Sequence, residues 1–127
     1  MIVGRRHTER YGCLVGTDDA APFLTAGRAP CFVAFHGFTG TTSEIRPLLE
    51  RVADRGYAVQ APLLPGHGSH PGKLQDATFD DWVAAMRREV AAAQARHERF
   101  VLCGFSLGSL VALELASESP SGLLGIV

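Results

Sequence analysis

The sequence has no excess of charge of either sign. Its 127 residues carry 12 lysines and arginines against 13 aspartates and glutamates, so the formal net charge is −1. Proteins that bind nucleic acid or an anionic membrane surface ordinarily present a strongly basic patch or stripe. The even balance therefore argues against nucleic acid as a partner.

Long hydrophobic segments are also missing. A membrane-spanning helix needs roughly 18 or more apolar residues in a row, and no run in this sequence approaches that length. The start, Met1 to Gly4, turns polar at once from Arg5 to Arg10, without the apolar core of a secretory signal peptide. We therefore expect a cytoplasmic protein with no stable membrane anchor.

Cysteine is scarce. The three cysteines, Cys13, Cys31 and Cys103, are scattered, odd in number and without C-x-x-C spacing. A disulfide framework or a zinc site needs paired and correctly spaced ligands. The pattern predicts reduced cysteines, two of them in apolar runs, and no metal.

What the chain does have is a regular alternation of apolar runs and helical periodicity. Residues 31–35 form a continuous apolar run between Pro30 and Gly37, typical of a strand buried on both faces. Leu48, Leu49 and Val52 follow helical spacing, and Thr42 or Ser43 is the expected N-cap. The expected strands are 22–25, 31–35, 57–61, 100–103 and 123–127, and the expected helices are about a dozen residues ending before Gly56, one opened by a capping box at 78–81, and 107–117.

This order predicts an α/β fold with a mostly parallel sheet flanked by helices. We assign residues 1–21 to a poorly defined lead-in and residues 22–127 to one domain. The loop at 62–76 is rich in proline and glycine, and a loop of this length in a compact domain is usually functional or mobile. The aromatic side chains of Phe79 and Trp82 are expected in the core, and the apolar segment 107–117 is expected to be a buried helix.

Residues 104–108 read G-F-S-L-G, a G-x-S-x-G pentapeptide, where a buried strand gives way to a helix. A strand that turns abruptly into a helix strains the serine backbone, and side chains at the flanking glycines would collide with the strand and the helix. Such a turn exposes the Ser106 hydroxyl. It also leaves the Leu107 N–H free at a helix N-terminus, where it can stabilise an oxyanion. The sequence therefore predicts a nucleophile at Ser106.

Two further loops carry a family resemblance. Residues 36–40, H-G-F-T-G, directly follow one predicted strand, and residues 65–68, P-G-H-G, follow the next. With the pentapeptide they resemble the α/β-hydrolase fold, and within it the carboxylesterases and monoacylglycerol-lipase-like serine hydrolases, over residues 22–127. The resemblance implies that the backbone N–H of Phe38 is the second oxyanion donor and that His36 is structural. It also implies that the chain is an N-terminal part, ending after about the fourth core strand, with the lid and the C-terminal part absent.

No cofactor or metal is expected. His67 and His70 lie near Asp76 at i, i+3 spacing, but in a glycine- and proline-rich loop with no further histidine or cysteine nearby. Gly72-Lys73 does not fit a phosphate-binding loop, because both the gap from Gly66 and the residue after the lysine differ from that motif. We interpret His67 as part of the loop architecture.

The other two members of a serine triad are not in the sequence. In this fold the acid and then the histidine follow the nucleophile, and residues 107–127 contain no histidine and no aspartate. Glu114 and Glu118 lie on or just after the helix below the serine. A serine without its base is a poor nucleophile, so we expect this chain alone to be nearly inactive and prone to associate through its open sheet edge.

The sequence thus favours a serine hydrolase that cleaves small-molecule carboxylic esters through an acyl-enzyme on Ser106. The acid and the histidine would come from elsewhere, and a complementary C-terminal chain or segment is a candidate partner. Two alternatives stay open. One is a thioesterase or acyltransferase on the same fold, and the other is a non-catalytic remnant or split chain.

Overall fold

The computed structural model describes residues 20–127. Its five strands form one sheet in the order β1-β3-β2-β4-β5. The central strands run parallel, and β1 is antiparallel to its neighbour β3 at one edge. The mostly parallel sheet that the sequence predicts is therefore confirmed. The strands are β1 (Phe23–Thr25), β2 (Arg28–Phe35), β3 (Tyr57–Ala61), β4 (Phe100–Gly104) and β5 (Leu123–Ile126).

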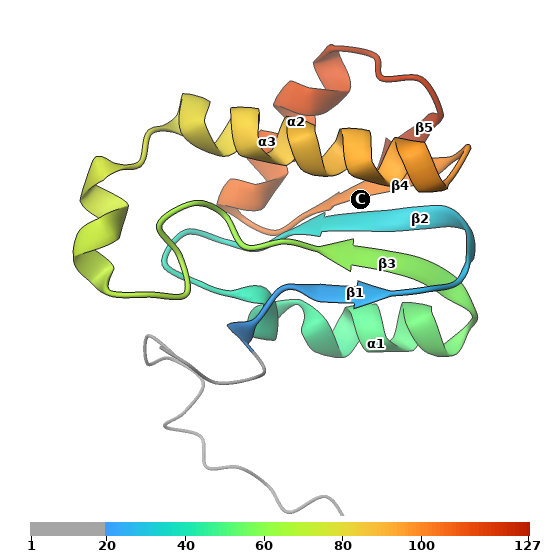
Figure 1. Ribbon diagram of the computed structural model, residues 1–127, viewed down its shortest axis with the longest axis horizontal. Coiled ribbons are helices and arrows are strands. Elements are labelled where there is room, and N and C mark those ends of the chain that lie inside the picture. The colour runs from blue at the N-terminus through green and yellow to red at the C-terminus, as the bar shows by residue number, and fades with distance from the viewer. Residues whose placement is uncertain (1–19) are drawn as a thin grey trace, which may run out of the picture.

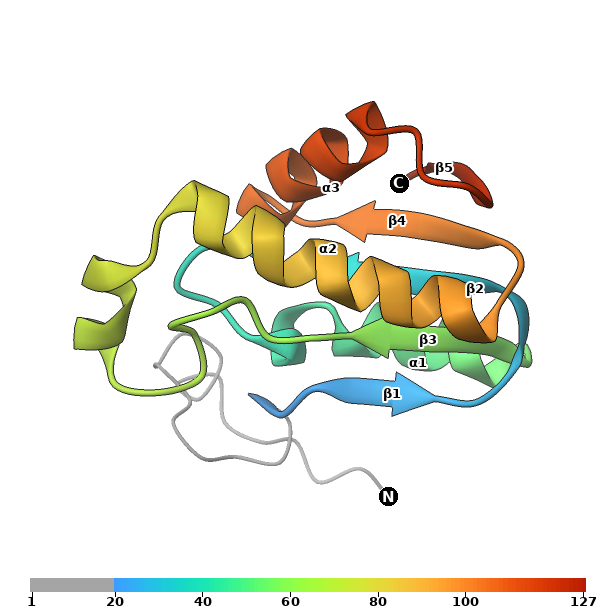
Figure 2. The same ribbon diagram turned by 45° about the horizontal axis from the view of Figure 1, so that its top comes forward.

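Helices cover both faces of the sheet. Helix α1 (Arg46–Asp54) lies on one face, and α2 (Phe79–Arg96) and α3 (Leu107–Ser117) lie on the other (Figures 1 and 2). The part of the chain outside the description includes Cys13 and most of the expected lead-in. Within residues 20–127, no helix is both long and apolar enough to cross a bilayer.

Strand β2 runs through the middle of the core. Val33 and Phe35 point to the cluster under α2 and α3, whereas Ala34 points to the cluster under α1. All three side chains are at most 2% exposed, because side chains alternate between the two faces of a strand. The prediction of a strand buried on both faces is confirmed.

β2 begins earlier than the apolar run indicates, at Arg28. The Arg28 N–H donates to the carbonyl of Gly56 at 2.8 Å, and its guanidinium lies 4.3 Å from the centre of the Tyr57 ring. This cation–π contact holds a charged residue in the strand. A pattern of apolar residues could not indicate it.

The start of the first helix differs from the expectation. The N-cap is Thr41, not Thr42 or Ser43, and it caps a 3₁₀ helix (Thr42–Glu44) that precedes α1. The buried Thr42 hydroxyl instead donates to the carbonyl of Ala21 at 2.6 Å. Gly56, with φ of +86°, follows the helix end as expected.

The loop at 62–76 is partly helical, since Pro71–Asp76 forms a second 3₁₀ helix. The capping box that opens α2 is confirmed: the Asp81 N–H donates to the Thr78 hydroxyl, and the Thr78 N–H donates to the Asp81 carboxylate. Trp82 is buried, but the expectation for Phe79 was wrong. It is 37% exposed, because it is the first residue of the helix and does not face the sheet.

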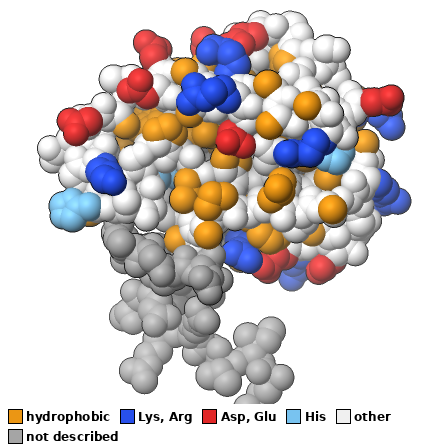
Figure 3. All heavy atoms as spheres, viewed as in Figure 1, with side chains coloured by type: hydrophobic (Ala, Val, Ile, Leu, Met, Phe, Trp, Pro, Cys, Tyr) orange, Lys and Arg blue, Asp and Glu red, His pale blue; other side chains and the backbone are white. Residues whose placement is uncertain are grey.

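Helix α3 is buried on one side only. Val111, Ala112 and Leu115 pack into the core, whereas Leu110 and Leu113 are more than half exposed. The predicted helix is confirmed, but the expected burial holds for one of its sides only. Elsewhere, acidic and basic side chains lie interspersed on the face drawn in Figure 3, as the near-zero net charge suggests.

Candidate active site

Three loops meet where parallel strands end. The arrowheads of β2, β3 and β4 point to the same edge of the sheet, and the segments that leave them lie together there (Figure 1). Ligands of α/β sheets bind in the crevice outside the carboxyl ends of the strands. The three motifs that the sequence singles out all lie at this edge.

The turn at Ser106 has the strained geometry that the pentapeptide predicts. Ser106 lies between β4 and α3 with φ of 53° and ψ of −118°, a left-handed backbone that a non-glycine residue rarely adopts. A Cβ at Gly104 would overlap the backbone of Ser109, and one at Gly108 would overlap the carbonyl of Phe35. The predicted need for glycine on both sides is confirmed, and the Ser106 side chain is exposed.

The loop after β2 lies directly against this turn. A Cβ built on Gly37 would be 3.4 Å from the Cβ of Ser106 and 3.4 Å from the ring of Phe105. The N–H of Phe105 also donates to the carbonyl of Phe35 at 3.0 Å. The serine and the H-G-F-T-G segment are therefore neighbours, brought together by the pairing of β2 with β4.

Two backbone amides at this junction are available to a ligand. Leu107 is the first residue of α3, so its N–H has no partner within the helix. Phe38 lies in the adjoining loop. Among the described residues, neither N–H donates to a backbone or side-chain acceptor. Unpaired N–H groups beside an exposed serine can bind a negative oxygen.

His36 is fully buried and both ring nitrogens are used. Its Nδ1 donates to the Gly37 carbonyl at 2.9 Å, and its Nε2 accepts from the Leu64 N–H at 3.0 Å. Burial lowers the pKa of His36 to about 4. A neutral ring with no free nitrogen cannot move a proton for Ser106, so the structural role expected for His36 is confirmed.

His67 is engaged in a similar way. Its Nδ1 donates to the Pro65 carbonyl at 3.2 Å, and its Nε2 accepts from the Thr39 N–H at 3.2 Å. Trp82 Nε1 donates to the same Pro65 carbonyl at 2.9 Å. Burial lowers the pKa of His67, so this ring too is held neutral.

The structure does not bring His67 and His70 together as ligands. His70 is exposed, and its Nδ1 accepts from the Gly72 N–H at 3.1 Å, which caps the 3₁₀ helix that follows. Across residues 20–127, no three histidine, cysteine or acidic side chains are grouped in a way that could hold a metal ion. Cys31 and Cys103 are free thiols, and burial raises the pKa of each to about 11.

Glu44 is a residue at the site that the sequence analysis missed. Its carboxylate lies against Gly40 and 3.6 Å from the position of a Cβ on Gly37. Burial raises the pKa of Glu44, and a hydrogen bond from the Gly37 backbone partly opposes this rise. No sequence signal marks it, because only the 3₁₀ turn at 42–44 folds its side chain back onto the loop.

The two glutamates that follow Ser106 lie elsewhere. Glu118 forms an ion pair with Arg87 of α2, with 2.6 Å between Nη2 and Oε1, and Glu114 is exposed on α3. Neither contacts the serine, as the sequence analysis expects.

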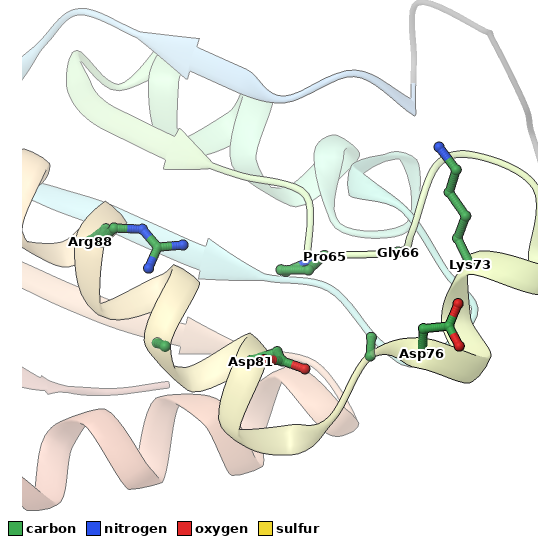
Figure 4. Close-up of a pocket in the computed structure, with 8 residues that line it drawn as sticks. Pro65, Gly66, Lys73, Asp76, Asp81 and Arg88 are labelled. Carbon is green, nitrogen blue, oxygen red and sulfur yellow. The ribbon is translucent and has the colours of Figure 1, made fainter.

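A hollow of about 530 Å³ lies between the second 3₁₀ helix and α2 (Figure 4). Side chains of both charges line it, including Lys73 and Asp76 from the 3₁₀ helix and Asp81 and Arg88 from α2. Ser106 is not among its lining residues. We therefore assign the candidate site to the Ser106 turn, where strain, free amides and an exposed hydroxyl coincide.

The sequence also matches a known protein family. The family model described as serine aminopeptidase, S33, matches residues 28–127, which include all three loops. The chain belongs to this hydrolase family. This chain has the α/β-hydrolase fold, as its resemblance in sequence implies.

Its relatives include lipases and esterases. The chain is 37% identical over 120 residues to a thermostable monoacylglycerol lipase of Bacillus sp. strain H-257, covering 94% of this chain and 46% of the relative. It is 33% identical over 107 residues to a carboxylesterase of Bacillus subtilis strain 168, covering 84% and 43%. A solved structure of LipS and LipT, two metagenome-derived lipolytic enzymes, matches with a TM-score of 0.81 and 30% identity, covering 86% of this chain and 44% of that one. The chain thus spans less than half the length of these relatives.

Proposed function

We propose that this chain supplies the nucleophile and the oxyanion hole of a serine ester hydrolase. Ser106 Oγ attacks the ester carbonyl carbon, and the N–H groups of Phe38 and Leu107 bind the oxygen that becomes negative. The alcohol then leaves, and water releases the acid from the acyl-serine. The single observation that supports this most is the strained, exposed Ser106 turn with the Gly37 loop packed against it.

The general base is proposed to lie outside this chain. It takes the Ser106 proton as the C–O bond forms and gives it to the departing alcohol. His36 and His67 are excluded from that role, because hydrogen bonds occupy both nitrogens of each ring. The acid and the histidine would then be supplied by a complementary C-terminal segment or chain, docked along β5.

The proposed substrates are small esters of fatty or other carboxylic acids. Phe38 and Phe105, each a little over half exposed, offer apolar surface on the two loops that meet at Ser106. The lipase and carboxylesterase relatives, which are 33–37% identical to this chain, point to the same class. A cytoplasmic location remains part of the proposal and rests on the sequence alone.

The test is covalent labelling with a fluorophosphonate probe, applied to the native gene product that contains residues 1–127. We expect labelling at Ser106, its loss in Ser106→Ala, and its retention in the matched control Ser109→Ala. The chain of 127 residues alone should turn over p-nitrophenyl esters about a millionfold more slowly than the native gene product does. This is the loss in rate seen when a serine triad is removed. Absence of labelling in the native gene product would support the non-catalytic remnant instead.

A second assay separates the ester hydrolase from a thioesterase or an acyltransferase. The three share the acyl-serine and differ in the acyl donor and in what accepts the acyl group. Faster turnover of an acyl thioester than of the matched oxygen ester would favour the thioesterase. Transfer to an added alcohol in preference to water would favour the acyltransferase.

A further inference from the structure

The oxyanion loop is tied to the loop after β3 by one side chain. Thr39 has φ of +62°, a left-handed conformation that costs a β-branched residue energy. Its N–H donates to Nε2 of His67, 28 positions further along the chain, at 3.2 Å. The ring of Phe38 also packs edge-on to His67, with 6.0 Å between the ring centres. Both the side chain of Phe38 and the peptide that follows it therefore rest on His67.

His67 is itself fixed in one tautomer. Because its Nδ1 faces the Pro65 carbonyl, Nδ1 must carry the proton, and Nε2 is left with a lone pair for the Thr39 N–H. The ring is 7% exposed and lies 4.8 Å from the His36 ring and 5.8 Å from that of Trp82. Packing and hydrogen bonds thus hold the acceptor in place.

We propose that His67 is a positioning residue that holds the Phe38 amide in its oxyanion-binding place, and that it does so only while its ring is neutral. This inference rests on the proposed function, in which the Phe38 N–H binds the oxyanion. Protonation of Nε2 would set one N–H against another at Thr39. The strained Thr39 backbone would then lose the hydrogen bond that stabilises it.

The groups around His67 bear on the pH at which its ring is protonated. His36 faces it from the end of β2 and is neutral, with both nitrogens bonded. On α2, Asp81 precedes Trp82, and its carboxylate accepts a hydrogen bond from the Thr78 N–H. The Glu44 carboxylate lies against Gly37 and Gly40 of the oxyanion loop. Burial is the main influence on the pKa of His67, and it lowers that pKa.

Two amide variants test the two nitrogens of the ring separately. In His67→Asn the amide can replace Nδ1 and donate to Pro65, but nothing reaches Thr39. In His67→Gln the longer amide can place its oxygen near the position of Nε2 and accept from Thr39. If His67 only filled space, His67→Gln would not label faster than His67→Asn.

The first measurement is the rate of fluorophosphonate labelling of Ser106 in the native gene product between pH 5 and pH 8. Loss of a whole oxyanion donor costs about 100- to 1,000-fold, and we expect His67→Asn to lose about 10- to 100-fold because the Phe38 amide is displaced rather than removed. His67→Gln should stay within about threefold of the wild type. Protonation of the catalytic histidine should slow labelling of both proteins at low pH. The wild type should show a further fall, caused by protonation of His67, that His67→Gln lacks.

The second measurement is an NMR titration of the wild-type gene product, which needs no activity and no variant. The His67 imidazole should show the Nδ1–H tautomer at neutral pH, and the Thr39 and Phe38 amides should shift with the titration of His67. Three outcomes would each overturn the inference. They are equal labelling rates in folded His67→Asn and wild type, equal losses of rate in both folded variants, and a Thr39 amide shift that does not follow the titration of His67. If the NMR result holds but Ser106 is never labelled, the proposed function fails while the link between His67 and the loop stands.

Discussion

Within the described residues, the carboxyl edge of the sheet and its edge at β5 differ in how completely their side chains are paired or covered. At the carboxyl edge, buried polar groups are paired: His36, His67 and Trp82 each donate to a backbone carbonyl, and both histidines also accept from an amide. At the β5 edge, apolar groups lack cover. Leu124 is 55% exposed and Ile126 is 41% exposed.

The described residues thus satisfy the polar groups of the site but do not cover the apolar groups of the β5 edge. Helix α1 packs beneath β3 and leaves the same face of β5 bare, while Leu110 and Leu113 of α3 are also exposed. The candidate site is therefore preorganised by groups inside the described chain. The sheet edge lacks the cover that a complete hydrophobic core would give it. Substitutions at the two edges should accordingly have different consequences.

The largest effect is expected from adding one methyl group at the site. In Gly108→Ala the new Cβ overlaps the Phe35 carbonyl and the His36 carbonyl, which are backbone atoms and cannot rotate away. We expect the free energy of unfolding to fall by about 3 kcal/mol, the upper range for an overpacked core. Gly125→Ala on β5 is the matched control, since nothing lies within 4 Å of its Cβ, and it should change stability by less than about 0.5 kcal/mol. Similar urea midpoints for the two variants would contradict the contrast.

The second effect is a dependence of stability on pH that originates at the site. Because the pKa of His36 is lowered to about 4 in the folded chain from an ordinary value of 6.5, the unfolded chain binds more protons between these values. Stability therefore falls as the pH drops through this window, and His67 acts in the same direction. We expect a loss on the order of 2 kcal/mol between pH 7 and pH 4.5, by urea unfolding.

The variant His36→Gln tests the origin of this slope. It removes the titrating ring and leaves the Gly37 carbonyl without the Nδ1–H donor, while the amide oxygen can still accept from the Leu64 N–H. It should therefore cost about 1–3 kcal/mol at pH 7 and flatten the acid-side fall. A slope as steep as that of the wild type would assign the pH dependence to other groups.

The sequence predicts the features that neighbouring residues determine, and it does not predict contacts between distant residues. The turn at Ser106 is predictable because G-x-S-x-G admits few backbone paths, and the capping box at Thr78 because its partners are three residues apart. The hydrogen bond from Thr39 to His67 joins residues 28 positions apart. No local pattern carries it. The contacts of Glu44 with Gly37 and Gly40 are local, but no sequence pattern indicates the 3₁₀ turn that brings its carboxylate there.

The errors about burial in the helices have a different cause. An apolar residue in a helical segment predicts burial only if a neighbouring element covers it. Within residues 20–127 nothing covers Leu110 and Leu113, so the helix is apolar on a side that remains exposed. The exposed Phe79 reflects its place at the helix start, which periodicity does not weigh.

The smallest effect on stability, and the clearest effect on association, is expected at β5. Leu124→Lys puts a charge on an open strand edge, a common protection against edge-to-edge pairing. We expect less self-association in sedimentation velocity, with the free energy of unfolding changed by less than about 0.5 kcal/mol, as for most surface substitutions. Leu48→Lys on α1 is the matched control, because Leu48 is 63% exposed and lies away from the sheet edge. If both variants reduce association equally, general surface hydrophobicity drives it, and the bare edge at β5 has no special part.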